Sequence, residues 1–139
     1  MEIKAFKSLP KEAKQIRISV FVNEQGFCDE FDETDKNAVH LVAFDNSEPV
    51  ATARIFYDDR QKMFIIGRIA VIKSRRGENI GSRIIEEAEK EILKLNGNTA
   101  YIHAQLQAKG FYQKIGYIPT GKEDVEQGCK HAWMMKKLL

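Results

Sequence analysis

The sequence lacks features that membrane proteins, secreted proteins and disulfide-rich proteins need. None of its apolar runs approaches the ~20 residues that span a bilayer, and its first residues do not form a basic start followed by an apolar stretch. Its two cysteines, Cys28 and Cys129, have no secretory signal beside them, so we expect ordinary reduced thiols. These absences argue against a membrane partner and predict a cytoplasmic protein.

A large excess of charge of one sign is also missing. The chain has 22 Lys and Arg residues against 20 Asp and Glu residues, a net charge of +2. That is too small to indicate a nucleic-acid-binding protein, which typically has a clear basic stripe. Charge is instead clustered locally, with basic residues at 73–83 and acidic residues at 24–35. Either cluster alone is also typical of a solvated face.

The chain does have the composition of a folded domain. It is 43% hydrophobic and 30% charged, which is apolar enough to offset the entropy lost on ordering the chain. A length of 139 residues suits one domain and is short for two. We therefore expect a single domain over residues 1–139, without repeats or linkers.

Hydrophobic periodicity predicts about seven strands and three or four helices, a mixed α/β (α+β) arrangement. The expected strands are 2–6, 39–44, 50–57, 63–72, 99–104, 117–119 and 131–137. The expected helices run from Pro10 to near Gly26, from 81 to Asn96–Gly97, and over about 105–114. Segment 63–72 is apolar at nearly every position except Arg68, which predicts a central strand covered on both faces.

The turn between the fourth expected strand and the second expected helix predicts an anion site. It reads Arg76-Gly77-Glu78-Asn79-Ile80-Gly81. A helix that begins at such a turn presents unpaired N–H groups and the positive end of its dipole. Gly77 and Gly81 let an anion approach the backbone, and Asn79 tolerates a positive φ. A purely structural turn explains the same pattern, whereas Gly-Lys-Ser/Thr and Gly-x-Gly-x-x-Gly loops are absent.

Several segments together resemble a known family. Ile69-Ala70-Val71 precedes the turn at 76–81, the run at 104–117 reads AQLQAKGFYQKIGY, and Phe21-Val22-Asn23-Glu24-Gln25 precedes Asp32, Asp35 and His40. In order and spacing these segments resemble the GNAT superfamily of N-acetyltransferases, and more narrowly its ElaA-type branch, over almost the whole chain. The resemblance implies a mixed, mostly antiparallel central sheet flanked by helices, and acetyl-CoA as cosubstrate.

The resemblance also implies which residues contact that cosubstrate. The expected set is Ile69, Ala70, Val71, Arg76, Gly77, Glu78, Asn79, Ile80, Gly81, Ser82, Gln105, Ala108, Phe111 and Tyr112. The family loop is Gln/Arg-x-x-Gly-x-Gly/Ala, so Asn79 stands where many relatives have glycine, and Gln105 stands where many have asparagine. The strand at 69–71 is expected to splay from its neighbour and pair with the pantetheine arm.

The chemistry of amide formation needs a polarised carbonyl, a neutral amine and a proton for the departing thiolate. The resemblance implies that the Val71 N–H holds the carbonyl and that Tyr112 donates to the sulfur. The stretch 65–70 contains no carboxylate to serve as base. Glu24, His40 and His131 are therefore candidates for that role, and each is also explained as a structural residue.

Arg54 and Arg68 fall on consecutive expected strands, where cross-strand neighbours lie about 5 Å apart. They would grip a substrate carboxylate if they face the cleft, or serve structure if they pair with Asp32, Asp35 or Glu24. No metal site is expected, because the segment at 29–35 lacks calcium-loop spacing and the His and Cys residues lack zinc spacing.

The sequence thus predicts acetyl transfer from acetyl-CoA to a primary amine of a small molecule or peptide, the acceptor being unidentified. The alternative is a module that senses acyl-CoA or binds a partner protein without turnover. An acyltransferase with a longer donor is a further alternative. The edge at Trp133 or the C-terminal strand offers a surface for a homodimer.

Overall fold

The computed structural model describes residues 1–27 and 31–139. Cys28 and the acidic residues at 29 and 30 lie outside the described residues. No helix among the described residues is long and apolar enough to cross a bilayer.

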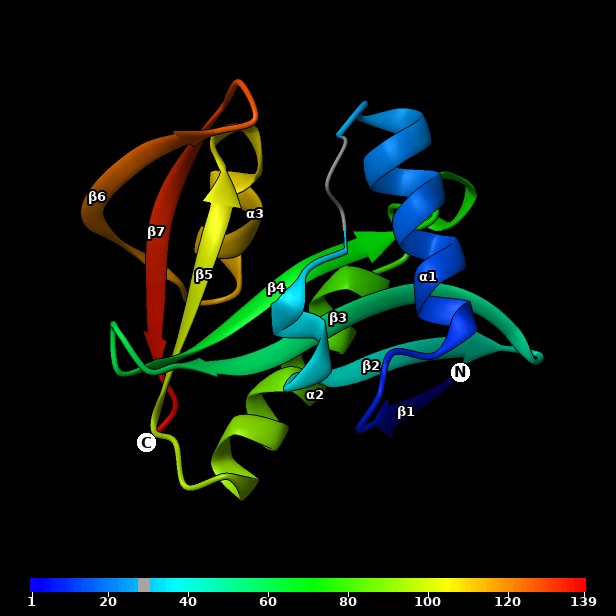
Figure 1. Cartoon of the computed structure of the whole chain (residues 1–139), viewed down its shortest axis with the longest axis horizontal. Coiled ribbons are helices and arrows are strands. Elements are labelled where there is room, and N and C mark those ends of the chain that lie inside the picture. The colour runs from blue at the N-terminus through cyan, green and yellow to red at the C-terminus, as the bar shows by residue number, and fades with distance from the viewer. Residues whose placement is uncertain (28–30) are drawn as a thin grey trace.

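The described residues form a mixed sheet of seven strands, as the sequence predicted, with helices on both faces (Figure 1). The strand order is β1-β2-β3-β4-β5-β7-β6, and every pairing is antiparallel except β4 with β5. The strands are β1 (Glu2–Phe6), β2 (Val39–Asp45), β3 (Glu48–Asp58), β4 (Met63–Val71), β5 (Thr99–Gln105), β6 (Ile118–Glu126) and β7 (Cys129–Lys137).

The helical segments are of two kinds, longer helices and single 3-10 turns. The longer ones are α1 (Lys11–Arg17), which continues into the π-helical η1 (Ile18–Glu24), α2 (Ile80–Lys94) and α3 (Lys109–Lys114). Single 3-10 turns are η2 (Glu33–Lys36), η3 (Lys73–Arg75) and η4 (Leu106–Ala108). In α2 the apolar residues recur three or four positions apart, so one face is buried and the other is charged.

The core lies on both faces of the sheet, because successive strand side chains point to opposite faces. Under α2, Ile84, Ala88 and Ile92 pack against strand residues such as Leu41 and Ala53. On the face of α1, Ala13 and Ile16 belong to a second cluster that contains Val42 and Ala70.

The centre of the sheet opens between β4 and β5. These strands pair at only three positions, Phe64 with Ala100, Ile65 with Tyr101 and Ile66 with Ile102. Immediately after this ladder, a bulge places two β4 residues opposite Ala53 of β3, and Arg68 within it has a left-handed φ of 49°. A bulge bends its strand, which accounts for the divergence of β4 from β5. The splay expected at residues 69–71 therefore starts at the bulge, with Arg68.

One strand boundary and one burial prediction need correction. The strand expected at 117–119 is the long edge strand β6, which runs to Glu126 and turns tightly into β7 at Gln127 and Gly128. Its residues are all exposed and mostly polar, so the sequence shows little strand pattern there. β4 is central as predicted, but its residues 67–69 are only half-buried because the sheet opens beside them.

The turn that terminates α2 lies at Asn96 and Gly97, where the sequence predicted the helix to stop, and the last helical residue is Lys94. Asn96 adopts a left-handed φ of 67°, and the Gly97 N–H donates to the Ile92 carbonyl at 2.9 Å. A Cβ at Gly97 would lie 2.5 Å from the Ile92 side chain, so only glycine fits against this turn.

Candidate active site

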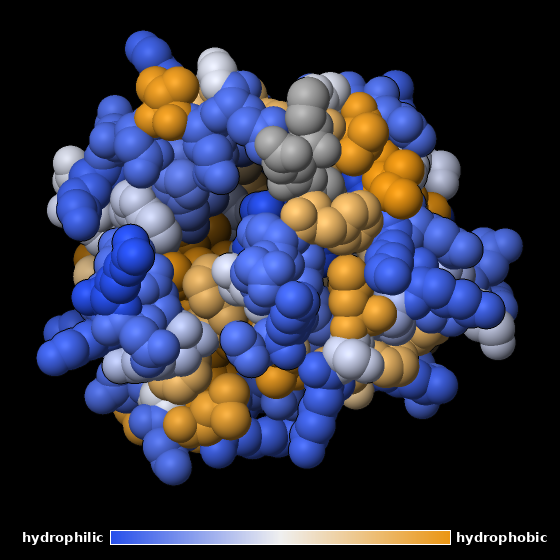
Figure 2. Space-filling view, in the orientation of Figure 1, coloured by the Kyte–Doolittle hydropathy of each residue, from blue (hydrophilic) through white to orange (hydrophobic). Residues whose placement is uncertain are grey.

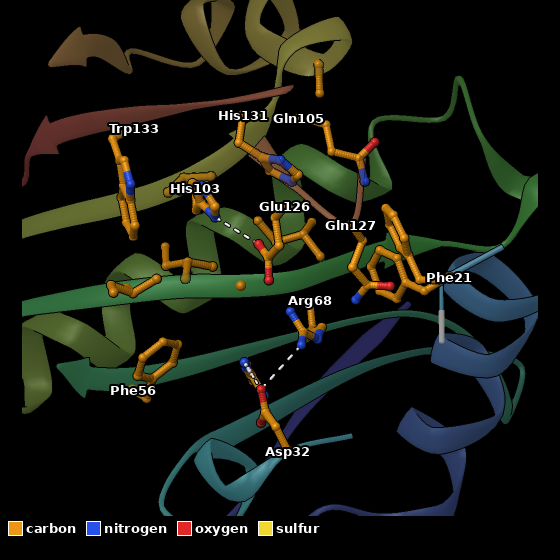
Figure 3. Close-up of a pocket in the computed structure, with 18 of the residues that line it drawn as sticks. Phe21, Asp32, Phe56, Arg68, His103, Gln105, Glu126, Gln127, His131 and Trp133 are labelled. Carbon is orange, nitrogen blue, oxygen red and sulfur yellow. Dashed lines mark hydrogen bonds and ion pairs between the residues drawn. The ribbon is translucent and has the colours of Figure 1, made fainter. Parts of the chain in front are cut away.

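A cavity of about 370 Å³ occupies the opening between β4 and β5. Its walls include Ile69 of β4, His103 of β5 and Tyr112 of α3, together with aromatic residues such as Phe21 and Trp133. Figure 2 shows apolar residues inside the hollow and hydrophilic side chains around its rim. The same cavity is drawn in close-up in Figure 3, where side chains from β4, β5 and β7 converge on it. The opening of the sheet is thus a substrate-sized site with mixed chemistry.

The turn before α2 has the geometry of an anion site. Gly77 and Asn79 have positive φ angles of 84° and 62°, and Asn79 is the N-cap of the helix. The Asn79 side chain makes no cap hydrogen bond, so the first N–H groups of α2, at Ile80, Gly81 and Ser82, keep their donors for another partner. The left-handed geometry at Asn79 is what the sequence predicted for a residue in place of the family glycine.

Arg76 connects this turn to the end of β4 and to η1. Its Nε donates to the Val71 carbonyl at 3.0 Å, and its two terminal nitrogens donate to Glu24 at 2.6 and 2.7 Å. The hydrogen bonds from Arg76 lower the pKa of Glu24 from its usual range. A general base near neutral pH needs a raised carboxyl pKa, and Glu24 does not line the cavity. The structure therefore places Glu24 beside the turn before α2, paired with Arg76.

Gly81 lies where the turn meets α3. A Cβ at this position would be 3.3 Å from the Phe111 ring and 3.7 Å from the Val71 side chain. Phe111 is 40% exposed and packs edge-on against Tyr112, with ring centroids 5.2 Å apart. The start of α2, the end of β4 and α3 therefore meet at one place, beside the cavity.

The backbone geometry supports a role for the Val71 N–H. The following N–H, of Ile72, donates to the carbonyl of Val50 in β3 at 3.0 Å. Successive N–H groups of a strand point to opposite edges, so the Val71 N–H points away from β3, toward the open side of β4. This is the direction that binding a carbonyl oxygen in the opening requires.

Tyr112 lines the cavity and is otherwise buried, with 8% of its surface exposed. Burial raises its pKa to about 12. The phenol therefore keeps its proton throughout the physiological range. Full proton transfer to a thiolate with a pKa of about 8.5 would be uphill by about 5 kcal/mol, so hydrogen-bond donation is the chemistry that this site favours.

The other residues expected near the pantetheine arm separate into two groups. Ile69, Gln105 and Ala108 line the cavity, whereas the Ala70 side chain packs in the cluster under α1. The Gln105 amide donates to Gln25 at 2.9 Å and accepts from Gln107 at 2.6 Å. It is therefore held in the opening by side chains from two other segments.

His40 lies away from the cavity. It is buried on β2, and its Nε2 donates to the Asp35 carbonyl at 2.9 Å. Burial lowers its pKa, and the nearby carbonyl only partly offsets this. The arrangement is that of a structural histidine that anchors η2 to β2.

Arg54 and Arg68 both contact acidic residues of the segment at 32–35. Arg54 donates to Asp32 at 2.7 Å and to Asp35 at 2.9 Å, and Arg17 also binds Asp35 at 2.8 Å. Burial alone would raise the pKa of Asp35, but hydrogen bonds from Arg17, the Asp32 backbone and Arg54 hold it far below its usual range. Arg68 lies 3.3 Å from Asp32 and lines the cavity with Arg54 (Figure 3).

This arrangement is the structural pairing that the sequence left open. Arg54 is 5% exposed, so most of its charge is satisfied within the protein. Binding of a substrate carboxylate by Arg54 and Arg68 stays a prediction, for which the more exposed Arg68 has the better position.

The opposite wall of the cavity contains residues that sequence reasoning missed. His103 lies between the rings of His131 and Trp133, with centroids 4.4 and 4.5 Å away (Figure 3). Its Nε2 lies 2.6 Å from Asp124. His131, a candidate base, lines the cavity, and its Nδ1 donates to the Cys129 carbonyl at 2.9 Å. The only sequence signal for this cluster was strand alternation, which puts 131 and 133 on one face of a strand and 103 on a face of another. The pairing of β5 with β7 gave no signal, because these strands are not consecutive in the sequence.

Comparison with known proteins identifies the fold and the family. The family model "Acetyltransferase (GNAT) domain" matches residues 9–138. The uncharacterized protein YyaT of Bacillus subtilis (strain 168) is 37% identical over 133 residues, covering 91% of this chain and 88% of YyaT. Protein ElaA of Escherichia coli (strain K12) is 33% identical over 131 residues, covering 90% of this chain and 85% of ElaA.

Solved structures agree with this result. The crystal structure of Escherichia coli ElaA matches with a TM-score of 0.85 and 28% identity in the structural alignment, covering 98% of this chain and 99% of that one. An aminoglycoside 6'-N-acetyltransferase complexed with coenzyme A shares the fold, with a TM-score of 0.77 at 18% identity, over 100% of this chain and 98% of that one. The sequence, the sheet topology and the opening between β4 and β5 agree with these matches. The chain belongs to the GNAT family of N-acetyltransferases.

Proposed function

We infer that the chain transfers the acetyl group of acetyl-CoA to a primary amine bound in the cavity, within a single domain over residues 1–139. The observation that carries this function is the continuity between an uncapped helix N-terminus and the cavity. The anion site at Asn79–Ser82 adjoins α3 through Gly81 and Phe111, and the next residue of α3, Tyr112, lines the cavity. A cofactor with a pyrophosphate at one end and a reactive thioester at the other fits this path.

The residues along the path have separate roles in the proposed reaction. The N–H groups at the start of α2 bind the pyrophosphate, with Arg76, Gly77 and Glu78 forming the preceding turn. The open edge of β4 at Ile69 and Val71 binds the arm, and the Val71 N–H stabilises the oxyanion. Tyr112 donates a hydrogen bond to the sulfur as the thiolate leaves.

Among the three base candidates, the geometry favours His131. It lines the cavity, and its Nδ1 proton is committed to the Cys129 carbonyl, so in the neutral ring Nε2 has a lone pair free to accept a proton. Glu24 and His40 do not line the cavity. We assign His131, directly or through water, to deprotonation of the substrate ammonium.

The acceptor is proposed to be a small-molecule or peptide amine, and neither nucleic acid nor membrane is part of the proposal. A cytoplasmic location and a homodimer through the C-terminal strand remain expectations from the sequence. Acidic groups at Asp32, Asp58 and Glu126 line the cavity, as do several aromatic rings, which suits an amine with an apolar body.

Calorimetric titration with acetyl-CoA, followed by a thiol-release assay over a panel of primary amines, tests the function. We expect binding that weakens with dephospho-CoA, because lost phosphate charge removes contacts with the basic cluster at 73–83. Turnover should fall in Tyr112→Phe while acetyl-CoA affinity is retained. Tyr57→Phe, an exposed tyrosine on β3, is the matched control and should behave as wild type.

The outcomes separate the alternatives. Binding of acetyl-CoA with no turnover on any amine would support the acyl-CoA sensor, and absence of binding would overturn the proposed function. A faster reaction with longer acyl-CoA donors would support the alternative acyltransferase.

A further inference from the structure

The cavity wall formed by β5, β6 and β7 brings together three side chains that can bind a metal. They are His103, Glu126 and His131, and one ligand atom of each lies within 4.8 Å of the others. All three line the cavity. Their positions in the sequence give no zinc-type spacing, which is why the sequence predicted no metal.

Hydrogen bonds to other groups fix the orientation of both histidines. A carboxylate and a carbonyl only accept, so the His103 nitrogen facing Asp124 and the His131 nitrogen facing the Cys129 carbonyl must each bear the proton. In the neutral rings, the lone pairs are then on His103 Nδ1 and His131 Nε2. Metal-binding histidines almost always have this arrangement, with the other ring nitrogen donating to a carboxylate or carbonyl.

The contact between His103 and Glu126 calls for a cation. His103 Nδ1 lies 3.3 Å from a Glu126 carboxylate oxygen. Two acceptors at this distance repel each other unless a proton or a metal ion lies between them. The separation is also the distance expected between two ligands of one tetrahedral zinc ion, about 3.3 Å for bonds of 2.0–2.1 Å.

The surroundings hold these ligands in place while leaving one side open. Trp133 stacks on His103, with ring centroids 4.5 Å apart. Glu126 lies on the exposed end of β6, so its side chain can shift. A shift of roughly an ångström would bring ligand atoms that lie within 4.8 Å of one another to zinc bonds of about 2 Å. All three residues line the cavity, so a bound ion would be reached from it.

We propose that His103, Glu126 and His131 form a zinc site in the wall of the acceptor cavity. Two imidazoles and one carboxylate suit Zn²⁺ and not Mg²⁺, which prefers oxygen ligands. The bound ion occupies His131 Nε2, the base of the proposed reaction, so zinc inhibits acetyl transfer. The binding site is independent of the proposed function, and only the inhibition rests on it.

Calorimetric titration of ZnCl₂ into the tag-free protein, without acetyl-CoA, tests the site directly. A Cys28→Ser/Cys129→Ser background removes thiol ligands. We expect one zinc ion per chain, no binding of MgCl₂, and weaker zinc binding as the pH falls, because the imidazoles must be unprotonated. No zinc binding, or several weak sites per chain, overturns the proposal.

Variants distinguish this site from adventitious binding. Glu126→Gln and His131→Ala remove ligands, and each should weaken zinc binding by more than tenfold. Asp124→Asn, which removes the partner of His103, should weaken it by about 10- to 100-fold. Glu123→Gln, an exposed change on the same strand, is the matched control and should bind zinc as wild type does. Equal affinity in Glu126→Gln and Glu123→Gln would contradict the site.

Inhibition provides a second measurement. Zinc should compete with the amine and not with acetyl-CoA, and a chelator should restore turnover. If no turnover is found, the calorimetric result still decides whether the site exists. If zinc binds at these residues and turnover is unaffected, the site stands and its role as an inhibitor is wrong.

Discussion

The two ends of the proposed active site, the turn before α2 and the cavity beside it, are built in different ways. In the proposed function, binding at the cofactor end depends on main-chain N–H groups at the start of α2 and on two backbone angles, those of Gly77 and Asn79. At the acceptor end, it would depend on side chains of β3 to β7 and of Asp32. Backbone sites tolerate sequence change that preserves conformation, whereas side-chain sites change with each substitution. This contrast accounts for a shared cofactor and divergent acceptors in one fold.

The substitution with the largest expected effect is Asp35→Asn, which acts on the acceptor end through Arg54. Asp35 binds both Arg17 and Arg54, which are 1% and 5% exposed, so the substitution leaves two buried guanidinium groups short of an anion. We expect the free energy of unfolding to fall by about 3–5 kcal/mol, measured by chemical denaturation. Asp59→Asn in the exposed β3–β4 turn is the control. A loss below 1 kcal/mol would show that the pair contributes little.

Tyr112→Phe tests the point where the two ends meet. It should lower kcat by about 100-fold, because a positioned proton or hydrogen-bond donor is lost, with acetyl-CoA affinity retained. Since burial raises the pKa of Tyr112 to about 12, wild-type kcat should show no loss from phenol ionisation below pH 11. A decline near pH 10 that disappears in Tyr112→Phe would contradict this environment.

Asn79→Val tests the backbone nature of the cofactor end. A β-branched residue at a φ of 62° costs about 1–2 kcal/mol, so acetyl-CoA should bind about 5- to 30-fold more weakly. Asn79→Gly adopts the same angle without this cost and should bind as wild type does. If the two variants bind equally, the side chain at position 79 and not its backbone angle determines affinity.

The smallest expected effect is the acid dependence of stability. The folded pKa of Asp35 lies below its unfolded value of about 3.9, so its stabilisation is complete above that value and is lost as the pH falls toward the folded pKa. Protonation is incomplete at accessible pH, so the loss should be smaller than in Asp35→Asn. Denaturation at pH 7 and pH 3 should therefore show a smaller difference for the variant than for wild type.

The sequence predicted features that depend on neighbouring residues better than contacts between distant residues. The turn at 76–81, the positive φ at Asn79 and the end of α2 at Gly97 depend on neighbouring residues, so they were predictable. The pairing of Arg54 with Asp32 depends on a contact across 22 positions, and the sequence could only offer it as one alternative.

The cluster at His103 was not predictable for a related reason. It requires that β7 lie between β5 and β6, which places His131 beside His103. The true length of β6 was missed as well, because a polar edge strand has one side in water and needs no apolar alternation. Because the sequence predicted this strand only to 119, it gave no reason to place Asp124 and Glu126 near the cavity.

The short ladder between β4 and β5 has a consequence for the behaviour of the protein in the cell. Beyond Ile66 and Ile102 the sheet has two unpaired inner edges, which are templates for pairing with other chains. In the proposed function, the pantetheine arm of the cosubstrate takes the place of the missing strand. Acetyl-CoA at 100 times its Kd would add about 2.7 kcal/mol to stability, so its supply would also protect the enzyme against aggregation.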